Sequence, residues 1–270
     1  MNKNILRDVM LQLPENMIGG VPGRSVASNA KPHIDQEMVL GLDIRDCFPK
    51  INHSTIHLIW SKWFGFDANS ARLLTQLTTL HRHLPQGSPT SLALCNLSLL
   101  PLYEDIDNYT SKAGLNFSMF VDDISVSGEK EPVQESIDTL IKIIQKHGYP
   151  VRHSKIRKMP RHTPQIVTGL LTNKKLAVSK TMIRMIRQGI IKLAKKEEPL
   201  FSKQVIMSKI GYVKGVSPEK GRALEDFANM LLSKQISVKS ERSKRGEIVS
   251  CNGKNCLALV SKKLLPVLSV

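Results

Sequence analysis

Two short apolar runs flank a pair of acidic residues near the middle of the chain. Residues 117–120 and 124–128 are rich in apolar and β-branched side chains, and Asp122 and Asp123 lie between them. Short runs on either side of a polar break predict a β-hairpin, here with the two acids at its tip. A second, mostly apolar run over residues 38–42 ends at Asp43, with Pro49 further on, and it predicts a buried strand.

Helical spacing of apolar residues dominates the segments around these strands. We expect helices over residues 3–13, 53–64, 69–80 and 88–100; Pro14 ends the first, and the Ser-Pro-Thr-Ser sequence at 88–91 is a helix-start signature. Residues 131–147 carry an amphipathic stripe formed by Val133, Ile137, Leu140, Ile141 and Ile144. A helix with such a stripe covers one face of a sheet, so the pattern predicts an α+β fold.

From residue 180 the pattern changes to helix with basic outer positions. Its apolar members are Met182, Ile183, Ile186, Ile190 and Ile191, and its basic members are Arg184, Arg187, Lys192, Lys195 and Lys196. Two interpretations stay open, a solvated helix face and an element that grips a nucleic-acid duplex. The last residues, 236–270, are first rich in Ser, Lys and Arg and then apolar. We expect one of three roles for them: packing back on the preceding helices, forming an interface, or helping to recognise RNA.

The charge of the chain favours a partner made of phosphates. Its 270 residues include 39 Lys and Arg against 23 Asp and Glu, a net charge of +16, and the isoelectric point is about 9.8. This balance is typical of proteins that follow a nucleic-acid backbone, whose binding weakens steeply with salt. A protein that is basic but merely soluble is the alternative. The length suffices for a real core and predicts two or more subdomains.

Cysteine usage and hydropathy indicate a reduced, cytoplasmic protein with no membrane partner. Four cysteines are too few for a disulfide scaffold, and we find neither a signal peptide nor an apolar run long enough to span a bilayer. Cys251 and Cys256 have no second pair or histidine nearby. For this pair we therefore predict a glycine-containing turn between short strands, not a zinc site. The other two cysteines are Cys47 and Cys95.

Paired carboxylates at a turn suggest a metal site. Asp is common in turns for local reasons, so an ordinary solvated turn is one interpretation, but adjacent like charges repel and stability gives little reason to pair them. If Asp43 and Asp122 lie at the ends of adjacent strands, they can hold two Mg²⁺ ions, with Mn²⁺ as an alternative, and leave positions for substrate phosphates. Asp46, three residues beyond Asp43, is a helix-start or surface residue.

Three blocks, in order, resemble the palm of a reverse transcriptase. Residues 42–48, Leu-Asp-Ile-Arg-Asp-Cys-Phe, are similar to its first metal-binding block; residues 84–91, with Gln86 and Gly87, to its second; and residues 120–123, Phe-Val-Asp-Asp, to its catalytic acidic block. Two further strings, Asn-Ala-Lys-Pro-His at 29–33 and Val-Thr-Gly at 167–169, resemble elements that mark retron reverse transcriptases. Residues 148–155 are similar to the block whose lysine, here Lys155, approaches the nucleotide phosphates.

The resemblance implies an α+β fold with polymerase right-hand architecture, in which an antiparallel palm sheet packs on helices. Residues 1–35 are then a partial fingers segment, 36–178 the palm, 179–235 a helical basic thumb and 236–270 a C-terminal extension. The implied reaction is RNA-directed DNA synthesis by two-metal nucleotidyl transfer, primed from an internal 2′-hydroxyl. The implied partners are a structured noncoding RNA that serves as template and primer, its DNA product and deoxynucleoside triphosphates. The implied setting is antiphage defence, with a defence effector protein as a further partner.

The resemblance also assigns roles to individual residues. Asp43, Asp122, Asp123 and the Ile44 carbonyl are implied metal ligands, and Lys155 is an implied general acid or phosphate contact. The implied nucleotide-binding residues are Phe48, which crowds a ribose 2′-hydroxyl, with Gln86, Gly87 and Arg45. The implied RNA-binding residues are Asn29, His33, Val167, Thr168, Gly169, Arg184 and Arg187.

The chain departs from the family at three positions and in one segment. Phe120 stands where Tyr is usual, Val121 where Ala is common, and His153 where Asn is frequent. The basic fingers hairpin expected upstream of residue 3 is missing. Three explanations stay open: the sequence is truncated, another chain supplies the fingers, or the protein polymerises poorly. Arg24 and Arg45 are the cations considered as partial substitutes. The alternative function is therefore a catalytically impaired, reverse-transcriptase-like scaffold that binds RNA. An enzyme of the group II intron type ranks lower, because its maturase extension and endonuclease region are absent.

Overall fold

The computed structural model describes residues 5–195 and 201–244. The chain forms two compact units, residues 1–176 and 177–270. The first unit holds a sheet and the helices around it, and the second is mainly helical. Among the described helices, none combines the length and the hydropathy needed to cross a bilayer.

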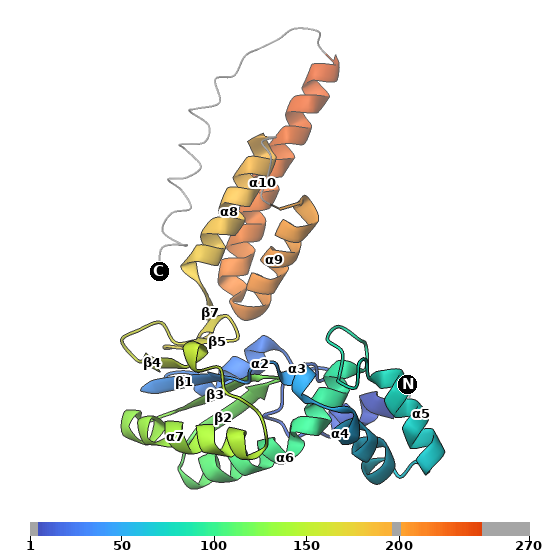
Figure 1. Ribbon diagram of the computed structural model, residues 1–270. Helices are drawn as coiled ribbons and strands as arrows, with labels where there is room; N and C mark the ends of the chain where they lie inside the picture. Colours follow the sequence, from blue (N-terminus) through green and yellow to red (C-terminus); the bar gives the residue numbers. More distant parts are fainter. Residues whose placement is uncertain (1–4, 196–200, 245–270) are drawn as a thin grey trace. The chain divides into compact units, whose positions relative to one another are not determined.

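An antiparallel four-stranded sheet forms the centre of the first unit (Figure 1). Its strand order is β2 (Asn116–Phe120), β3 (Asp123–Gly128), β1 (Met38–Asp43) and β4 (Arg157–Pro160). The predicted hairpin is therefore confirmed as β2 and β3, with Val121 and Asp122 in the turn between them. The predicted buried strand is confirmed as β1, in which every residue is buried.

The two faces of this sheet differ in chemistry because successive side chains of a strand point to opposite faces. Met38, Leu40 and Leu42 of β1, together with Ile124 and Val126 of β3, belong to the main apolar core. The other face of the same strands carries small and polar residues. Its members are Val39, Gly41, Asp43, Asp123, Ser125 and Ser127.

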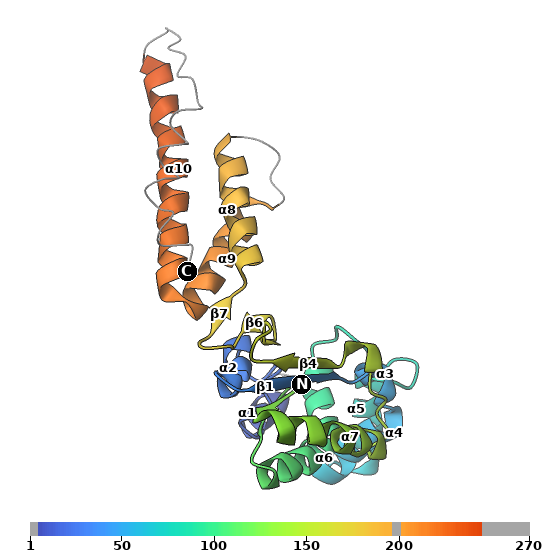
Figure 2. The ribbon, with the colours of Figure 1, turned by 90° about the vertical axis from the view of Figure 1, so that its left-hand side faces the viewer.

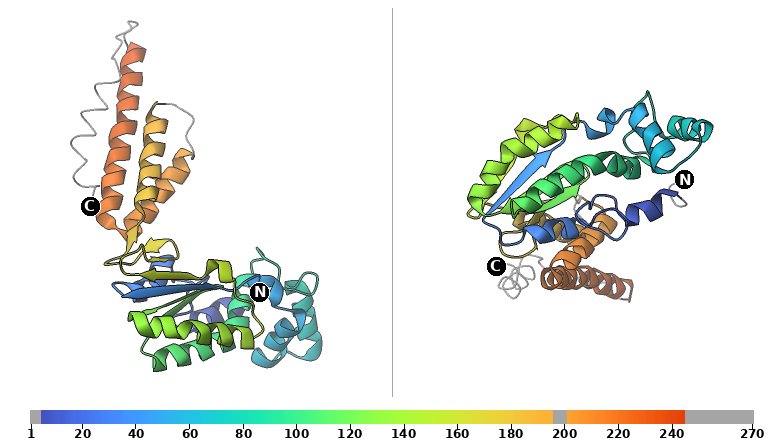
Figure 3. Two further views of the ribbon diagram at one scale, coloured as in Figure 1. Left: turned by 60° about the vertical axis from the view of Figure 1, so that its left-hand side comes forward. Right: turned by 90° about the horizontal axis from the view of Figure 1, so that it is seen from below.

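Two long helices cover the apolar face, α6 (Ser91–Lys112) and α7 (Lys130–Lys146), as Figures 1 and 3 show. The amphipathic stripe predicted on α7 is confirmed, since Val133, Ile137, Leu140 and Ile144 are buried. The prediction for α6 was too short. The helix continues through Pro101 to Lys112, because Leu102, Tyr103, Ile106 and Thr110 keep the helical spacing of its buried face. Their burial outweighs the about 3 kcal/mol that proline costs inside a helix.

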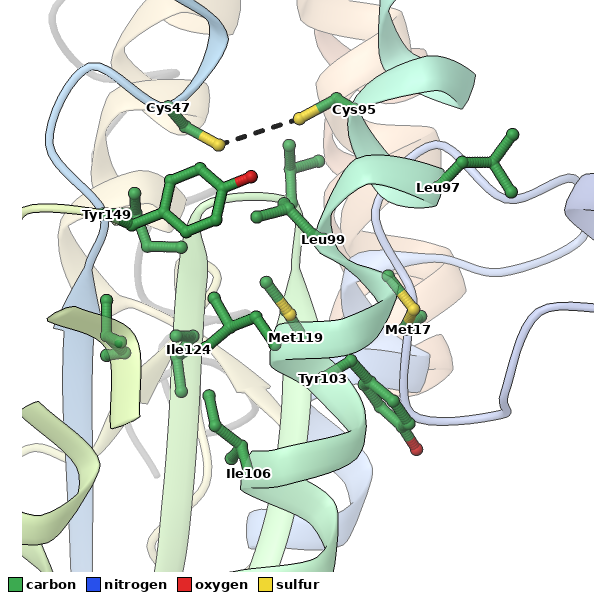
Figure 4. Packing of buried hydrophobic residues seen from close by; sticks show 14 of the residues in the cluster. Met17, Cys47, Cys95, Leu97, Leu99, Tyr103, Ile106, Met119, Ile124 and Tyr149 are labelled. Carbon is green, nitrogen blue, oxygen red and sulfur yellow. Dashed lines mark hydrogen bonds between the residues drawn. The ribbon is translucent and has the colours of Figure 1, made fainter. Parts of the chain in front are cut away.

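Figure 4 shows the core where α6 meets the end of β1. Cys47 lies in α3 (Cys47–Lys50) and Cys95 in α6, and their sulfur atoms are 3.7 Å apart, with Tyr149 beside them. Both cysteines are buried and free. The contact with Cys47 and burial together raise the pKa of the Cys95 thiol, so it stays protonated. Cys251 and Cys256, for which we predicted a turn, lie outside the described residues.

The remaining helices of this unit are shorter. The predicted helix over 53–64 is α4 (His53–Leu58), continued by the π-helical turn η3 (Ile59–Trp63), and that over 69–80 is α5 (Ala68–Thr78). The first predicted helix is α1 (Arg7–Leu11), shorter than the 3–13 expected; residues 1–4 are not described. The segment after it contains α2 (Val26–Ala30) and the 3₁₀ turn η2 (Lys31–His33). A small hairpin of β5 (Ile166–Val167) and β6 (Leu170–Leu171) follows β4.

The second unit begins with β7 (Ala177–Val178), followed by α8 (Lys180–Lys195), α9 (Lys203–Val216) and α10 (Pro218–Lys244), which Figures 1 and 2 show packed together. The predicted apolar stripe of α8 turns inward, since Ile183, Ile186 and Ile190 are buried. Two glycines permit close packing. A Cβ at Gly221 would lie 2.2 Å from the Cα of Lys214, and one at Gly189 would lie 2.8 Å from the Cδ1 of Ile206.

Candidate active site

Three acidic residues lie where β1, β3 and the hairpin turn end. Asp43 and Asp123 are direct cross-strand partners in the register of β1 and β3. Asp122 lies in the adjacent turn, and its carbonyl accepts a hydrogen bond of 3.0 Å from the backbone N–H of Ile44. The strand pairing therefore brings together residues that stand about 80 positions apart in the sequence.

The hairpin turn holds an uncommon backbone conformation. Val121 has φ of +59° and lies between the two strands, with only 8% of its surface exposed. Positive φ at the first of two central turn residues is the pattern of a type II′ turn, which normally has glycine there. A β-branched residue in this region is strained. Such strain persists where the surroundings fix the backbone. Val121 packs closely against Gly19: a Cβ at Gly19 would lie 2.5 Å from the Cγ2 of Val121.

Burial and mutual repulsion raise the pKa values of both turn acids. The pKa of Asp122 is raised first by burial and also by the charge of Asp43. The pKa of Asp123 is raised first by burial, then by the charges of Asp122 and Asp43. Lys155, Arg152 and Arg157 partly offset these shifts. The arrangement accumulates negative charge that a cation would stabilise.

Two cations contact Asp43, and the sequence indicated only one of them. Lys155, in the 3₁₀ turn η4 (His153–Lys155), has its Nζ 3.1 Å from Oδ2 of Asp43. Arg152 has its Nε 3.4 Å from Oδ1 of Asp43 and its Nη2 3.4 Å from Oδ1 of Asp46. The resemblance assigns a role in this segment to Lys155 alone, and therefore it did not indicate Arg152. Asp46, expected at a helix start or on the surface, is the exposed N-cap residue of α3.

The donor set fits a hard divalent cation in its chemistry. Asp43 is 7% exposed, and its buried Oδ1 accepts no well-formed hydrogen bond, although Arg152 is near. Carboxylate oxygens are the ligands that Mg²⁺ prefers. Within the described residues, however, no three acidic, histidine or cysteine side chains are already gathered around one point as metal ligands. The predicted ligands Asp43, Asp122, Asp123 and the Ile44 carbonyl remain a prediction, and a metal would compete with Lys155 and Arg152 for Asp43.

The predicted nucleotide-binding residues fall into two surroundings. Phe48 is half-buried against the core, whereas Arg45 is exposed and its backbone N–H donates to the carbonyl of Pro150. Gln86 and Gly87 are exposed, and Gly87 has φ of +90°, a conformation that glycine adopts without strain. These four roles remain predictions.

Arg24 is committed to the fold. Its guanidinium donates to the carbonyls of Leu13, Pro14 and Met17, and so fixes the segment before it. These contacts occupy the guanidinium within the fold.

Asn29, His33 and Val167 lie inside the fold, and their implied part in RNA binding remains a prediction. Asn29 and His33 are fully buried, and Val167 is 1% exposed. The His33 ring nitrogens lie 2.7 Å from Oγ of Ser127 and 2.8 Å from Oγ of Ser118. These side chains therefore act inside the fold. The sequence does not indicate the burial of Asn29 and His33, because polar side chains are mostly found at the surface.

The Val-Thr-Gly string forms the turn between β5 and β6. Thr168 and Gly169 have φ of +44° and +83°, and positive φ at both central residues is the pattern of a type I′ hairpin turn. Thr168 Oγ1 donates to the carbonyl of Val26 at 3.1 Å, and Asn29 Nδ2 lies 3.5 Å from the same Oγ1. The two retron-like strings are thus neighbours in space. Gly169 is exposed and Thr168 half-buried, so direct RNA binding by these two stays a prediction.

The basic residues of α8 differ from one another. Arg184 is exposed. The Arg187 guanidinium lies over the ring of Phe227 in α10, 5.3 Å from the ring centre, so it contributes to the packing of the helices.

Comparisons with known proteins identify the family of the chain. The family model described as reverse transcriptase (RNA-dependent DNA polymerase) matches residues 1–188. The chain belongs to the reverse transcriptase family. It is 30% identical over 224 residues to the retron Mx65 reverse transcriptase of Myxococcus xanthus, and 27% identical over 190 residues to the retron Ec86 reverse transcriptase of Escherichia coli. These relatives confirm the retron-type resemblance.

The matched regions cover 76% and 69% of this chain but only 52% and 59% of the two retron reverse transcriptases. The chain therefore spans a little over half the length of these relatives. A telomerase from Candida albicans, solved in complex with a fragment of telomeric RNA, has a TM-score of 0.53 and 10% identity, covering 88% of this chain and 54% of its own. At this identity the likeness shows the fold alone. It confirms the predicted α+β, right-hand-like reverse transcriptase fold.

Proposed function

We propose that this reverse transcriptase chain catalyses RNA-directed DNA synthesis. The observation that carries the proposal is the cross-strand pair of Asp43 and Asp123 with Asp122 in the adjacent turn, at the end of the polar sheet face. Acids held together at a cost in repulsion, beside basic side chains, suit the transfer of a phosphoryl group. The family model supports the same reaction.

The side chains at the site take complementary parts in this reaction. Asp43 and Asp122 would hold two divalent ions, which when bound activate the attacking hydroxyl and neutralise charge on the phosphates. Lys155, which contacts Asp43 in the unbound chain, would be released to contact phosphate or to protonate the pyrophosphate leaving group. Phe48 would limit space at the ribose 2′-position, while Gln86 and Gly87 would lie against the template and nucleotide. Asp123 is a weaker ligand or a support of the turn.

The charge of the second unit supports an RNA-binding role for its helices. Residues 177–270 contain 19 Lys and Arg against seven Asp and Glu, a net charge of +12 out of the +16 of the whole chain. Arg184 is exposed on α8 and suits contact with a phosphate backbone. From the retron relatives we extend the proposal to a structured RNA primed at a 2′-hydroxyl, and to a role in antiphage defence with an effector protein.

Primer extension tests the proposal. The purified chain, an RNA template with a DNA primer, Mg²⁺ and deoxynucleotides should yield DNA, and Asp122→Asn should abolish synthesis while RNA affinity stays nearly unchanged. Asp105→Asn is the matched control, because Asp105 lies on α6 and pairs with Lys146 and His147 at the end of α7. RNA binding without any DNA product, with Mg²⁺ and with Mn²⁺, would instead establish the impaired scaffold.

A further inference from the structure

A buried histidine joins the two strands of the catalytic hairpin. His33 is fully buried, with one ring nitrogen 2.7 Å from Oγ of Ser127 in β3 and the other 2.8 Å from Oγ of Ser118 in β2. The two serines are not cross-strand partners, since Ser118 pairs with Ser125 and Ser127 pairs with Asn116. The imidazole therefore spans the hairpin diagonally, on the same sheet face as the carboxylates.

The hydrogen bonds define which nitrogen of His33 carries the proton. Ser118 Oγ donates its only proton to the carbonyl of Asn29 at 3.2 Å, so it must accept from Nε2–H of His33. The other nitrogen, Nδ1, is then the acceptor for the hydroxyl of Ser127. Burial lowers the pKa of His33 to about 4, so the ring is neutral at neutral pH, as this arrangement requires.

The same contacts tie the hairpin to the segment that precedes β1. His33 ends η2, and Asn29 belongs to α2, which also meets the 167–169 turn through Thr168. Every polar group of the imidazole and of the Ser118 hydroxyl is thus used to hold β2 and β3 against one short segment. The turn with Asp122 follows Ser118 by only three residues.

We propose that His33 is a positioning residue for the catalytic carboxylates. Its neutral imidazole fixes β2 and β3 relative to α2 and η2, and so fixes the turn that carries Asp122 and the first residue of β3, Asp123. This inference rests on the proposed function of that turn as the metal site. It does not require His33 to touch a substrate or a metal.

A triple variant separates positioning from simple core stability. His33→Leu alone would leave the buried hydroxyl of Ser127 without a partner and would remove the donor that Ser118 accepts from, so it should destabilise the fold. His33→Leu combined with Ser118→Ala and Ser127→Ala removes the imidazole and both hydroxyls and leaves no buried donor unpaired. Its one remaining loss is the hydrogen bond from Ser118 to the Asn29 carbonyl, so its stability should stay closer to the wild type than that of His33→Leu. Ser136→Ala is the matched control, because Ser136 is also fully buried but bonds only within α7, at the opposite sheet face.

The measurements are Mn²⁺ affinity by calorimetry, hydrogen exchange of residues 119–124, and single-turnover primer extension. If His33 positions the carboxylates, the triple variant melts near the wild type but binds Mn²⁺ more weakly, exchanges faster in the hairpin, and loses about tenfold or more in rate with unchanged primer affinity. Wild-type Mn²⁺ affinity and exchange in a folded triple variant would overturn the proposal.

Ser127→Ala provides the same readouts should the triple variant fail to fold, since it removes one contact of the ring. Unchanged Mn²⁺ affinity and hairpin exchange in this variant would also overturn the proposal. Mn²⁺ affinity and exchange do not depend on catalysis. An inactive wild type would therefore count against the proposed function, while a response of the hairpin to these substitutions would still support the positioning role.

Discussion

Arg152 competes with any metal ion for the carboxylate of Asp43. Its guanidinium approaches both Asp43 and Asp46, and Asp43 is almost fully buried. Replacing Arg152 by Gln should lower the melting temperature in a chelator, because a buried charge loses a partner. The same change should strengthen Mn²⁺ binding several-fold, because less positive charge opposes the ion.

Calorimetric titration with Mn²⁺ and thermal melting with chelator check this prediction. Arg161→Gln is the control, since Arg161 pairs with the exposed Asp35. Weaker Mn²⁺ binding by the Arg152 variant would mean that the arginine supports the metal site and does not compete with it.

His33 should give the first unit a pH-dependent stability. Its pKa falls from 6.5 in the unfolded chain to about 4 in the fold because of burial. Between these values the unfolded state binds more protons, so the free energy of unfolding decreases as the pH is lowered from 6.5 towards 4. The full shift corresponds to about 3 kcal/mol.

Urea unfolding followed by tryptophan fluorescence measures this effect, because Trp60 and Trp63, the two tryptophans of the chain, both lie in the first unit. His33→Gln lacks the titrating group but keeps a donor and an acceptor. The difference in unfolding free energy between wild type and variant should shrink as the pH falls through this window. A difference that is constant with pH would contradict the assigned pKa.

The residues of the site differ in how far the sequence alone indicates their role. Asp43, Asp122 and Asp123 could be selected because acids at strand ends and turns have few structural reasons to be there. Burial of His33 and Asn29 could not, because it depends on Ser118 and Ser127, which stand more than 80 positions away. Arg152 was hidden for the same reason, since its acidic partners lie on another strand end.

Among the elements, α9 and α10 pack closely at Gly221. A Cβ at Gly221 would meet the backbone of Lys214, which cannot move away as a flexible side chain can. Gly221→Ala should therefore destabilise the second unit by about 1–3 kcal/mol. Gly211→Ala is the matched control, because Gly211 lies in α9 with open space around a Cβ, and alanine there should stabilise the helix by about 0.5–1 kcal/mol.

Thermal melting by far-UV circular dichroism follows the helices of both units. Tryptophan fluorescence follows the first unit alone, and comparing the two signals identifies the transition of the second unit. The two variants should shift the helical transition in opposite directions. A Gly221→Ala protein that melts with the wild type would show that α9 and α10 can separate without loss of stability.

Elements with regular patterns were predicted well, and those with mixed patterns were not. The stripe of α7 specifies its bounds to within a residue of the structure. Helix α6 was cut short because Pro101 and the acids after it interrupt an apolar run, although its buried face continues. Helix α5 buries Ala71, Thr75 and Thr78 while Leu73 and Leu77 stay exposed, which no amphipathic rule anticipates.

For the whole molecule, fold class and family followed from the order of blocks along the chain, because strand-end acids and their spacing are local features. The distribution of charge between the two units could not be predicted in this way, since it depends on how the chain divides into folded units. The count by unit assigns +12 of the net +16 to residues 177–270. The net charge of the whole chain therefore predicted a nucleic-acid partner but not the unit that carries most of the charge.

Substitution of two arginines on α8 should affect different properties, RNA affinity in one case and stability in the other. Arg184 is exposed, whereas Arg187 lies over Phe227. Arg184→Gln should weaken RNA affinity at low salt and reduce the slope of log affinity against log salt by about 0.7–0.9, as expected for one lost phosphate contact. Arg187→Gln should instead lower the stability of the second unit by about 0.5–1 kcal/mol through the lost cation–π contact, with a smaller change in the slope.

Filter binding to a structured RNA at several salt concentrations gives the slopes, and melting gives the stabilities. Lys112→Gln is the control for charge alone, because it removes one exposed positive charge from the first unit. If RNA binding depends on the local charge of α8, the control keeps the wild-type slope while Arg184→Gln does not. Equal slopes for Arg184→Gln and wild type would favour the other interpretation, that α8 has a solvated helix face. RNA binding would then depend on other basic positions of the chain.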